Sequence, residues 1–197
     1  MSTAPLNSFI SRATASPFAL SLGLGLGTVS YYFWGNVASQ VFGAISIPIH
    51  PKDRKKLGID TSKGVEIWAW AYKLGAKHMG VSAAVSGLAV MAAAFQLPAA
   101  KELSISRKYL LLLSAGLLSN GIWTVAIMLP TNNRLIAIRD KIVLRKSGAE
   151  SSISSLTVAE EEEAETLLQK WKRMHYVRLG LGALGYIGTL AAYVTTI

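Results

Sequence analysis

The sequence predicts an all-α membrane protein built as a bundle of four transmembrane helices. Of its 197 residues, 51% are hydrophobic and only 16% are charged, whereas soluble domains carry roughly a quarter charged residues. The mean hydropathy is positive, at +0.38. Four windows also lack Asp, Glu, Lys and Arg, and each is about as long as the 20 or so residues that cross a bilayer as a helix.

The uncharged windows place the predicted spans near 18–46, 78–97, 109–129 and 175–196. The apolar part of the first window is about twice as long as the hydrophobic region of a cleaved signal peptide. We therefore interpret it as a permanent helix that follows a short tail, residues 1–16. The whole chain, 1–197, is then expected to form a single integral membrane domain.

The distribution of Lys and Arg predicts the orientation of these spans. The segments 50–77 and 131–174 hold 15 of these residues, whereas 4 lie on the opposite side. Because basic loops stay in the cytosol, both segments are expected to be cytosolic loops, with both termini on the non-cytosolic side. The net charge of +9 then reflects topology and contact with anionic membrane lipid, not binding of nucleic acid. The chain has no cysteine, which excludes disulfides and thiol chemistry.

Small residues recur at helical spacing in the first and fourth predicted spans. Such strips let helix backbones approach closely in lipid, so both are expected to pack against neighbouring helices. The strips are Gly27, Gly35, Ser39 and Gly43 in the first span, and Gly182, Gly185, Gly188 and Ala192 in the fourth.

The two predicted cytosolic loops carry helical signals of their own. Thr157-Val-Ala-Glu160 matches a capping box after a polar linker, 147–155, and predicts a helix from about Val158 to about Thr195. Its acidic run, 160–165, is interpreted as a solvated helix start. In the first loop, an interfacial helix over 64–77 is expected, because Trp68, Trp70 and Tyr72 suit the headgroup zone.

Polar residues gather where the predicted spans meet the cytosol. His78 opens the second span, and Asn132 and Asn133 follow Pro130 at the end of the third. One interpretation is a helix stop with a solvated loop. The other is that these amides line a site together with the fourth helix, where Trp171, His175 and Arg178 follow one another at i, i+4 and i+7 on one face. Polar groups on a packed face of a membrane helix usually belong to a pathway or a site.

Two motifs resemble the signature of the anthrone oxygenase family. They are Leu129-Pro-Thr-Asn-Asn-Arg-Leu135 and Trp171-Lys-Arg-Met-His-Tyr-Val-Arg178. The frame of four spans in fewer than 200 residues is similar to that family as well. The resemblance implies oxidation of an anthrone, a planar aromatic polyketide, to an anthraquinone, with dioxygen as co-substrate. It further implies an endomembrane location such as the endoplasmic reticulum.

The implied reaction requires no organic cofactor, because an anthrone anion is electron-rich enough to reduce dioxygen. His175 is the expected base, with His78 as its rival. Stabilisation of phenolate and peroxide charge is expected from Asn132, Asn133 and Arg178. Trp171, Trp68 and Tyr72 are expected to stack on the planar substrate.

Three alternatives remain open at this point. A copper or iron ion could be bound by His50, His78 and His175, and haem could lie between the last two. A non-enzymatic scaffold, transport or assembly protein with four spans is a different class of function. The sequence does not predict the natural substrate or the oligomeric state.

Overall fold

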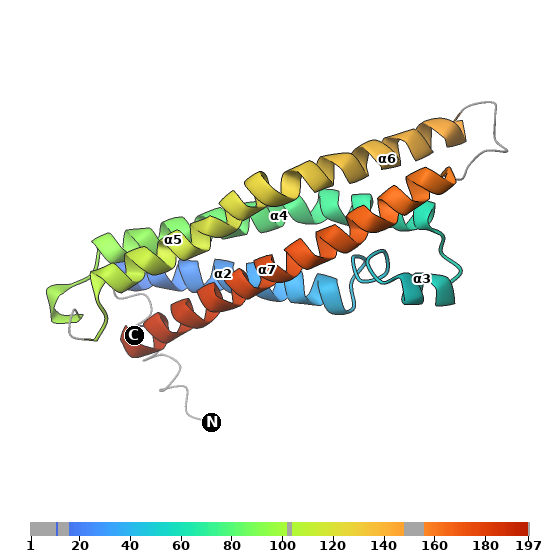
Figure 1. Cartoon of the computed structure of the whole chain (residues 1–197). Helices are drawn as coiled ribbons and strands as arrows, with labels where there is room; N and C mark the ends of the chain where they lie inside the picture. The colour runs from blue at the N-terminus through green and yellow to red at the C-terminus, as the bar shows by residue number, and fades with distance from the viewer. Residues whose placement is uncertain (1–10, 12–15, 102–103, 148–155, 197) are drawn as a thin grey trace, which may run out of the picture. The chain divides into compact units, whose positions relative to one another are not determined.

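The computed structural model describes residues 11, 16–101, 104–147 and 156–196, and these contain helices and no strand. The tail 1–16 and the linker 147–155 therefore lie almost wholly outside the described residues. The helices are α2 (Pro17–Val41), α3 (Pro51–Lys56), α4 (Thr61–Phe95), η1 (Ala99–Lys101), α5 (Arg107–Trp123), η2 (Thr124–Met128), α6 (Leu129–Ser147) and α7 (Val158–Thr196), shown in Figure 1. The predicted all-helical class is confirmed for this part of the chain.

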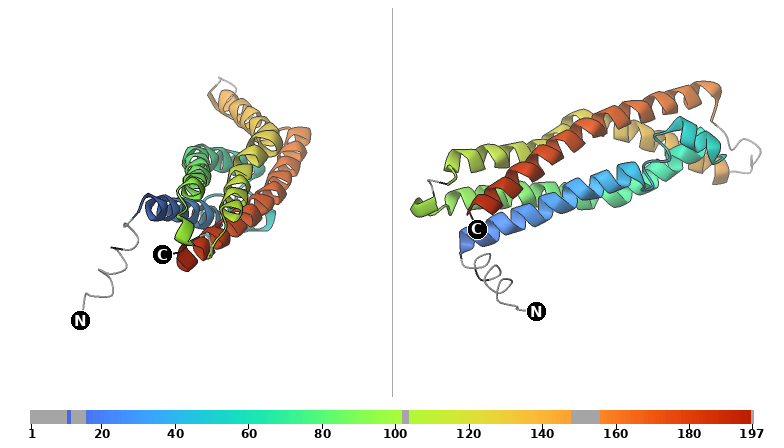
Figure 2. Two further views of the ribbon diagram at one scale, coloured as in Figure 1. Left: turned by 90° about the vertical axis from the view of Figure 1, so that its left-hand side faces the viewer. Right: turned by 90° about the horizontal axis from the view of Figure 1, so that it is seen from below.

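Helices continue through two of the predicted span boundaries. α4 joins the expected interfacial helix and the second span into one helix of 35 residues. The helix also does not end at Pro130, since α5, η2 and α6 follow one another without a loop, as Figure 2 shows. The missing N–H of a proline normally breaks a helix. Here the five residues before Leu129 form a π-helical turn, a distortion that lets a helix continue past a local fault.

The prediction for the last helix is confirmed. α7 runs from Val158 to Thr196 as a single helix of 39 residues. The capping box forms as expected: the Thr157 backbone N–H donates to Glu160 at 3.1 Å, and the Glu160 N–H donates to the Thr157 hydroxyl at 3.3 Å. This reciprocal pair satisfies two backbone donors that a helix start leaves free.

The helices contribute to two compact units. Unit 1 comprises the described residues within Met1–Gly35, Met79–Ile122 and Leu179–Ile197, and unit 2 comprises Asn36–His78 and Trp123–Arg178. Each of α2, α4 and α7 supplies residues to both units. Leu22, Val90 and Leu117 lie in the apolar core of unit 1. Trp68, Leu135 and Trp171 lie in that of unit 2.

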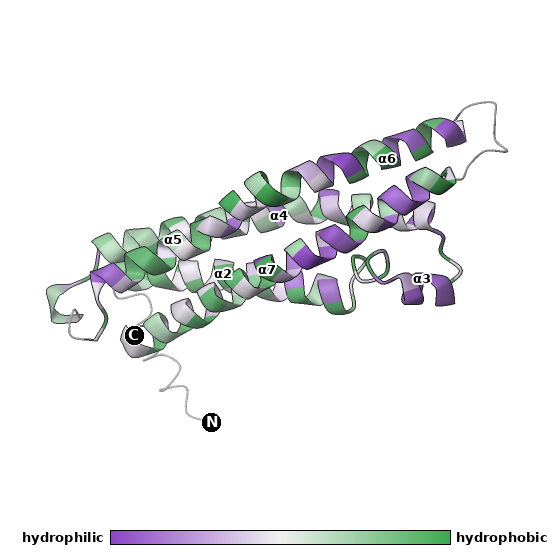
Figure 3. Cartoon of the chain, in the orientation of Figure 1, coloured by the Kyte–Doolittle hydropathy of each residue, from purple (hydrophilic) through white to green (hydrophobic). Residues whose placement is uncertain are grey.

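Among the described residues, three helices are long and apolar enough to cross a membrane: Thr61–Phe95, Arg107–Ser147 and Val158–Thr196. They indicate an integral membrane protein. Hydrophilic residues concentrate on α3, on α6 and on the first turns of α7, as Figure 3 shows. α2 has 25 residues and carries no charge, but it is not among these three helices. The four-span bundle and the positions of the termini stay predictions.

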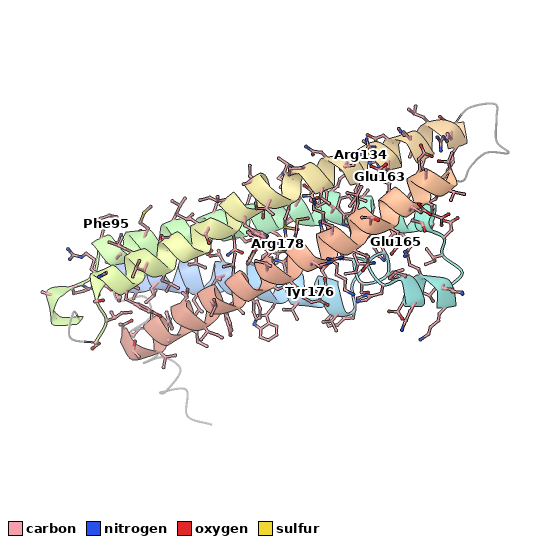
Figure 4. All side chains as sticks on the ribbon, in the orientation of Figure 1. Phe95, Arg134, Glu163, Glu165, Tyr176 and Arg178 are labelled. Carbon is pink, nitrogen blue, oxygen red and sulfur yellow. The ribbon has the colours of Figure 1, made fainter. Side chains whose placement is uncertain are left out.

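The acidic run at the start of α7 is not merely solvated, in contrast to its interpretation from the sequence. Its carboxylates bind partners on three other helices of unit 2. The pairs are Arg145–Glu160, Arg134–Glu163, Arg54–Glu165 and Thr61–Glu161. Figure 4 shows Arg134 and Glu163 facing each other from α6 and α7. Arg54 is buried but Glu165 is 31% exposed, so salt screens their ion pair only in part.

The small-residue strip of α7 packs as predicted, whereas that of α2 packs only in part. A Cβ at Gly188 would lie 2.8 Å from Leu113 Cδ1, and one at Gly185 would overlap the Leu117 side chain. In α2, a Cβ at Gly35 would lie 2.9 Å from Met79 Cε, whereas Gly27 has no neighbour within 4 Å, and Gly25, outside the predicted strip, also lies close to a partner helix. A four-residue repeat does not reveal which residues of a helix face a partner when several glycines compete.

Close packing at Gly185 gives the first prediction. Gly185→Val is expected to destabilise unit 1 by about 1–3 kcal/mol, because the new side chain overpacks against Leu117. Gly180 has no neighbour within 4 Å, so Gly180→Val is the matched control and should change stability by less than about 0.5 kcal/mol. Unfolding of both variants in detergent measures the difference. Equal loss in the two variants would contradict the packing shown here.

Candidate functional site

Three polar and aromatic side chains of α7 lie on one face of the helix, as predicted from their spacing. The rings of Trp171 and His175 stack with centroids 4.7 Å apart and planes inclined by 14°. The Arg178 guanidinium nitrogen Nη2 lies 2.8 Å from Nδ1 of His175. All three belong to unit 2. His175 is 2% exposed and Trp171 is also 2% exposed, so this face is buried.

Asn36 of α2 joins this group, and the sequence analysis missed it. Nη2 of Arg178 donates to Oδ1 of Asn36 at 2.8 Å, and Asn36 is buried. A signal was available, since an amide inside an uncharged helix must find a polar partner when it is buried. The identity of that partner could not be read from the sequence, because Asn36 and Arg178 are 142 residues apart.

Trp68 and Tyr72 of α4 extend the stacked pair of α7 into a run of four rings. Their own rings are parallel, 5.1 Å apart and inclined by 5°. Trp68 also meets Trp171 edge to face at 5.9 Å. We call Tyr72, Trp68, Trp171 and His175 the aromatic run. The sequence assigned Trp68 to the membrane interface, but it is fully buried, whereas Trp70 is exposed.

Asn132 lies at the Tyr72 end of the aromatic run. Its Nδ2 donates to the Tyr72 hydroxyl at 3.2 Å, and the side chain is 1% exposed. The hydrogen bond of Asn132 is thus to Tyr72 of α4, and not to the α7 face that carries His175 and Arg178. Asn133 is exposed on α6, so the structure does not bring it to the same group. On a helix, neighbouring residues point about 100° apart, and only one of two adjacent amides can face the core.

Several buried side-chain atoms around the aromatic run have no hydrogen-bond partner among the described residues. They are Nε1 of Trp68, Nε1 of Trp171, Oδ1 of Asn132 and Nε2 of His175, and both amide atoms of Gln40, in the same unit, are unpartnered as well. Leaving a buried polar group unsatisfied costs about 1–3 kcal/mol, and indole N–H groups usually find a partner when buried. Such a concentration of donors and acceptors suits a ligand with several polar groups on an aromatic frame.

The environment of His175 determines which of its nitrogens carries the proton. A guanidinium can only donate, so the contact with Arg178 requires a lone pair on Nδ1 and places the proton of a neutral imidazole on Nε2. The backbone carbonyl of Asn36 also bonds to the imidazole. Because Nε2 has no partner in the described part of the chain, this carbonyl competes with Arg178 at Nδ1 and favours an N–H on that nitrogen. A hydrogen bond from a cation is about twice as strong as a neutral one, so the state with the proton on Nε2 is favoured. The unpartnered Nε2 is then a donor.

The other two histidines lie apart from this group. Nδ1 of His50 is 2.7 Å from the Ser46 carbonyl oxygen, and His78 is exposed near the middle of α4. Among the described residues, no group of three or more His, Cys, Asp or Glu side chains is placed to hold a metal ion. The described residues therefore do not bring His50, His78 and His175 together as the three-histidine alternative requires.

Asn36 gives the second prediction. Asn36→Leu removes an acceptor of the buried Arg178 guanidinium and is expected to destabilise the protein by about 1–3 kcal/mol. Asn133→Leu, the same change at an exposed amide, should alter stability by less than about 0.5 kcal/mol. Thermal unfolding in detergent compares the two. Similar midpoints for Asn36→Leu and the parent would show that the Asn36–Arg178 bond contributes little.

The comparisons with known proteins agree with the two sequence motifs. Neither the curated proteins nor the solved structures give a match to this chain. The family model described as "Anthrone oxygenase" matches residues 68–188, which is more than half of the sequence. This range includes the whole aromatic run, Asn132 and Arg178, and it ends before the last turns of α7. The chain therefore belongs to the anthrone oxygenase family.

Proposed function

We propose that this protein is a membrane enzyme that oxidises an anthrone to the corresponding anthraquinone with dioxygen. The observation that carries the proposal is the buried aromatic run flanked by unpartnered hydrogen-bonding atoms in a chain of this family. An aromatic polyketide offers planar apolar rings together with keto and phenolic oxygens. Those groups match the aromatic lining and the free N–H and C=O groups.

The proposed reaction balances without a further reductant. Loss of a proton from the anthrone methylene gives a delocalised anion whose charge rests largely on the keto oxygen. This anion passes electrons to dioxygen, and a C–O bond forms at the former methylene carbon. Protonation gives a hydroperoxide, which loses water as the second C=O bond forms. Anthrone and dioxygen thus become anthraquinone and water, and both oxygen atoms of dioxygen are accounted for.

We propose that His175 acts on the keto oxygen through Nε2. The base role predicted from the sequence requires a lone pair on Nε2, whereas the contact with Arg178 favours a proton there. A neutral imidazole that donates from Nε2 would polarise the anthrone carbonyl and make the methylene more acidic. The released proton would then pass to water. The Arg178 charge, 2.8 Å from Nδ1, would further stabilise the anion.

Asn132 would bind the substrate at the Tyr72 end of the run. Its Oδ1 can accept a hydrogen bond from a phenol or from the hydroperoxide. Turning the amide by 180° preserves the bond to Tyr72, because a phenol hydroxyl both donates and accepts. The turned amide would present Nδ2 to an oxyanion. Asn132 can therefore serve the substrate before and after charge develops.

The proposal includes the membrane arrangement predicted from the sequence. α2 would cross the membrane as well and bring the number of spans to four. Both termini would lie on the non-cytosolic side, and the basic segments would face the cytosol. A flat apolar polyketide partitions into lipid and could reach the aromatic run from the bilayer. An endomembrane, such as that of the endoplasmic reticulum, would suit such a substrate.

Asn132 gives the third prediction. Asn132→Ala is expected to lower kcat about 10²–10³-fold, the usual loss when one preorganised donor to a developing oxyanion is removed. Asn133→Ala is the matched control, since Asn133 is exposed, and it should retain full activity. The assay follows quinone absorbance with emodin anthrone in detergent under air, with the spontaneous oxidation subtracted and a nitrogen blank. Wild-type protein that does not exceed the spontaneous rate would exclude the proposed function.

His175 gives the fourth prediction. His175→Ala should lose at least as much activity as Asn132→Ala, and higher pH should partly restore it by ionising the anthrone in solution. Two further variants separate the roles of the side chain. Gln donates a hydrogen bond but is not a base, whereas Glu is a base that cannot donate when ionised. The donor role predicts His175→Gln to be more active than His175→Glu. The opposite order would restore the base role.

A further inference from the structure

Gln40 of α2 is a buried amide that the roles proposed above do not use. It is 6% exposed, and both Oε1 and Nε2 lack a hydrogen-bond partner among the described residues. Burying a full amide without partners is costly, because a donor and an acceptor are both left unsatisfied. An apolar residue would serve packing better at such a position. Gln40 also lies outside the residues that the family model matches.

Three contacts show where Gln40 lies along α7. The segment from α2 to α3 runs antiparallel to α7: Asn36 pairs with Arg178, the Ile49 carbonyl accepts from Gln169, and Arg54 pairs with Glu165. As the residue number rises from Asn36 to Arg54, the number of the partner residue on α7 falls from 178 to 165. Gln40 follows Asn36 by four residues and precedes Ile49. Its level on α7 therefore lies between Arg178 and Gln169, where Trp171 and His175 are found.

Helical spacing places Gln40 on the same face of α2 as Asn36. Residues four apart lie one above the other, about 6 Å apart along the helix axis. Asn36 reaches the Arg178 end of the group, so Gln40 lies about one turn farther along, toward Trp171. The Trp171 indole N–H is itself unpartnered. The Gln40 amide and this indole N–H are thus unpartnered groups at neighbouring levels along α7.

We propose that Gln40 is a specificity-determining residue that binds a ring hydroxyl of the aromatic substrate. The inference rests on the proposed function and adds a residue to it. A phenol hydroxyl both donates and accepts, and the Gln40 amide offers an acceptor in Oε1 and a donor in Nε2. The keto oxygen would bind at His175, and a hydroxyl elsewhere on the rings would bind at Gln40. The enzyme would then favour hydroxylated anthrones over unsubstituted anthrone.

The test compares two substrates in wild-type protein and in Gln40→Met, which keeps the length of the side chain but removes its polar atoms. The substrates are 1,3,8-trihydroxy-6-methylanthrone (emodin anthrone) and anthrone without ring hydroxyls. Loss of the Gln40 contact should raise KM for the hydroxylated substrate about tenfold with kcat nearly unchanged, because the contact is made equally in ground and transition states. KM for unsubstituted anthrone should change less than twofold. Gln96→Met is the matched control, since Gln96 is exposed and belongs to unit 1.

Gln40→Asn gives a second variant in case Gln40→Met does not fold. It keeps the amide but withdraws it by one methylene, so the preference for the hydroxylated substrate should fall without loss of the folded protein. Binding of hydroxylated and unsubstituted anthraquinone, followed by quenching of Trp fluorescence, reports the same preference without turnover. Equal effects of either variant on both ligands would show that Gln40 binds only water or the protein, and would overturn the inference alone. Wild-type protein that oxidises neither anthrone would overturn the proposed function with it.

Discussion

The Arg178 guanidinium organises the polar part of unit 2. It donates to Asn36 on α2 and to the His175 imidazole on its own helix. Because a guanidinium always carries its proton and only donates, it fixes the orientation of the Asn36 amide and the tautomer of His175. His175 in turn stacks on Trp171, so the arrangement of the aromatic run depends on the same cation. A neutral side chain at position 178 could not impose that order.

The uninterrupted helix α7 makes this arrangement possible. Its first turns carry the carboxylates that pair with α3 and α6. About two to four turns beyond Glu165, the same helix presents Trp171, His175 and Arg178. The ion pairs hold the start of α7 against its neighbours, and helical continuity transmits that position to the site. The acidic run therefore supports the site, although none of its members belongs to it.

The unpartnered atoms of the aromatic run indicate a conflict between stability and function. Unit 2 buries indole N–H groups, an imidazole nitrogen and amide atoms that its own residues do not satisfy, and each lowers stability. Proteins keep such groups where a ligand uses them, and binding sites accordingly break the rule that buried polar groups are paired. The proposed polyketide substrate explains this pattern through one set of contacts. Packing alone would favour apolar residues at the same positions.

The sequence by itself determined the helical class, the membrane character, the course of α7 and the shared face of Trp171, His175 and Arg178. These features depend on local periodicity and composition, which a single chain displays directly. It also identified Asn132, but it could not separate Asn132 from Asn133, nor recognise Asn36 and Gln40. Tertiary structure decided those points, because the burial of a residue depends on which neighbour covers its face of the helix. It likewise decided that the helix continues through Pro130. A proline inside a helix is expected to end it, but the π-helical turn before Pro130 accommodates the proline.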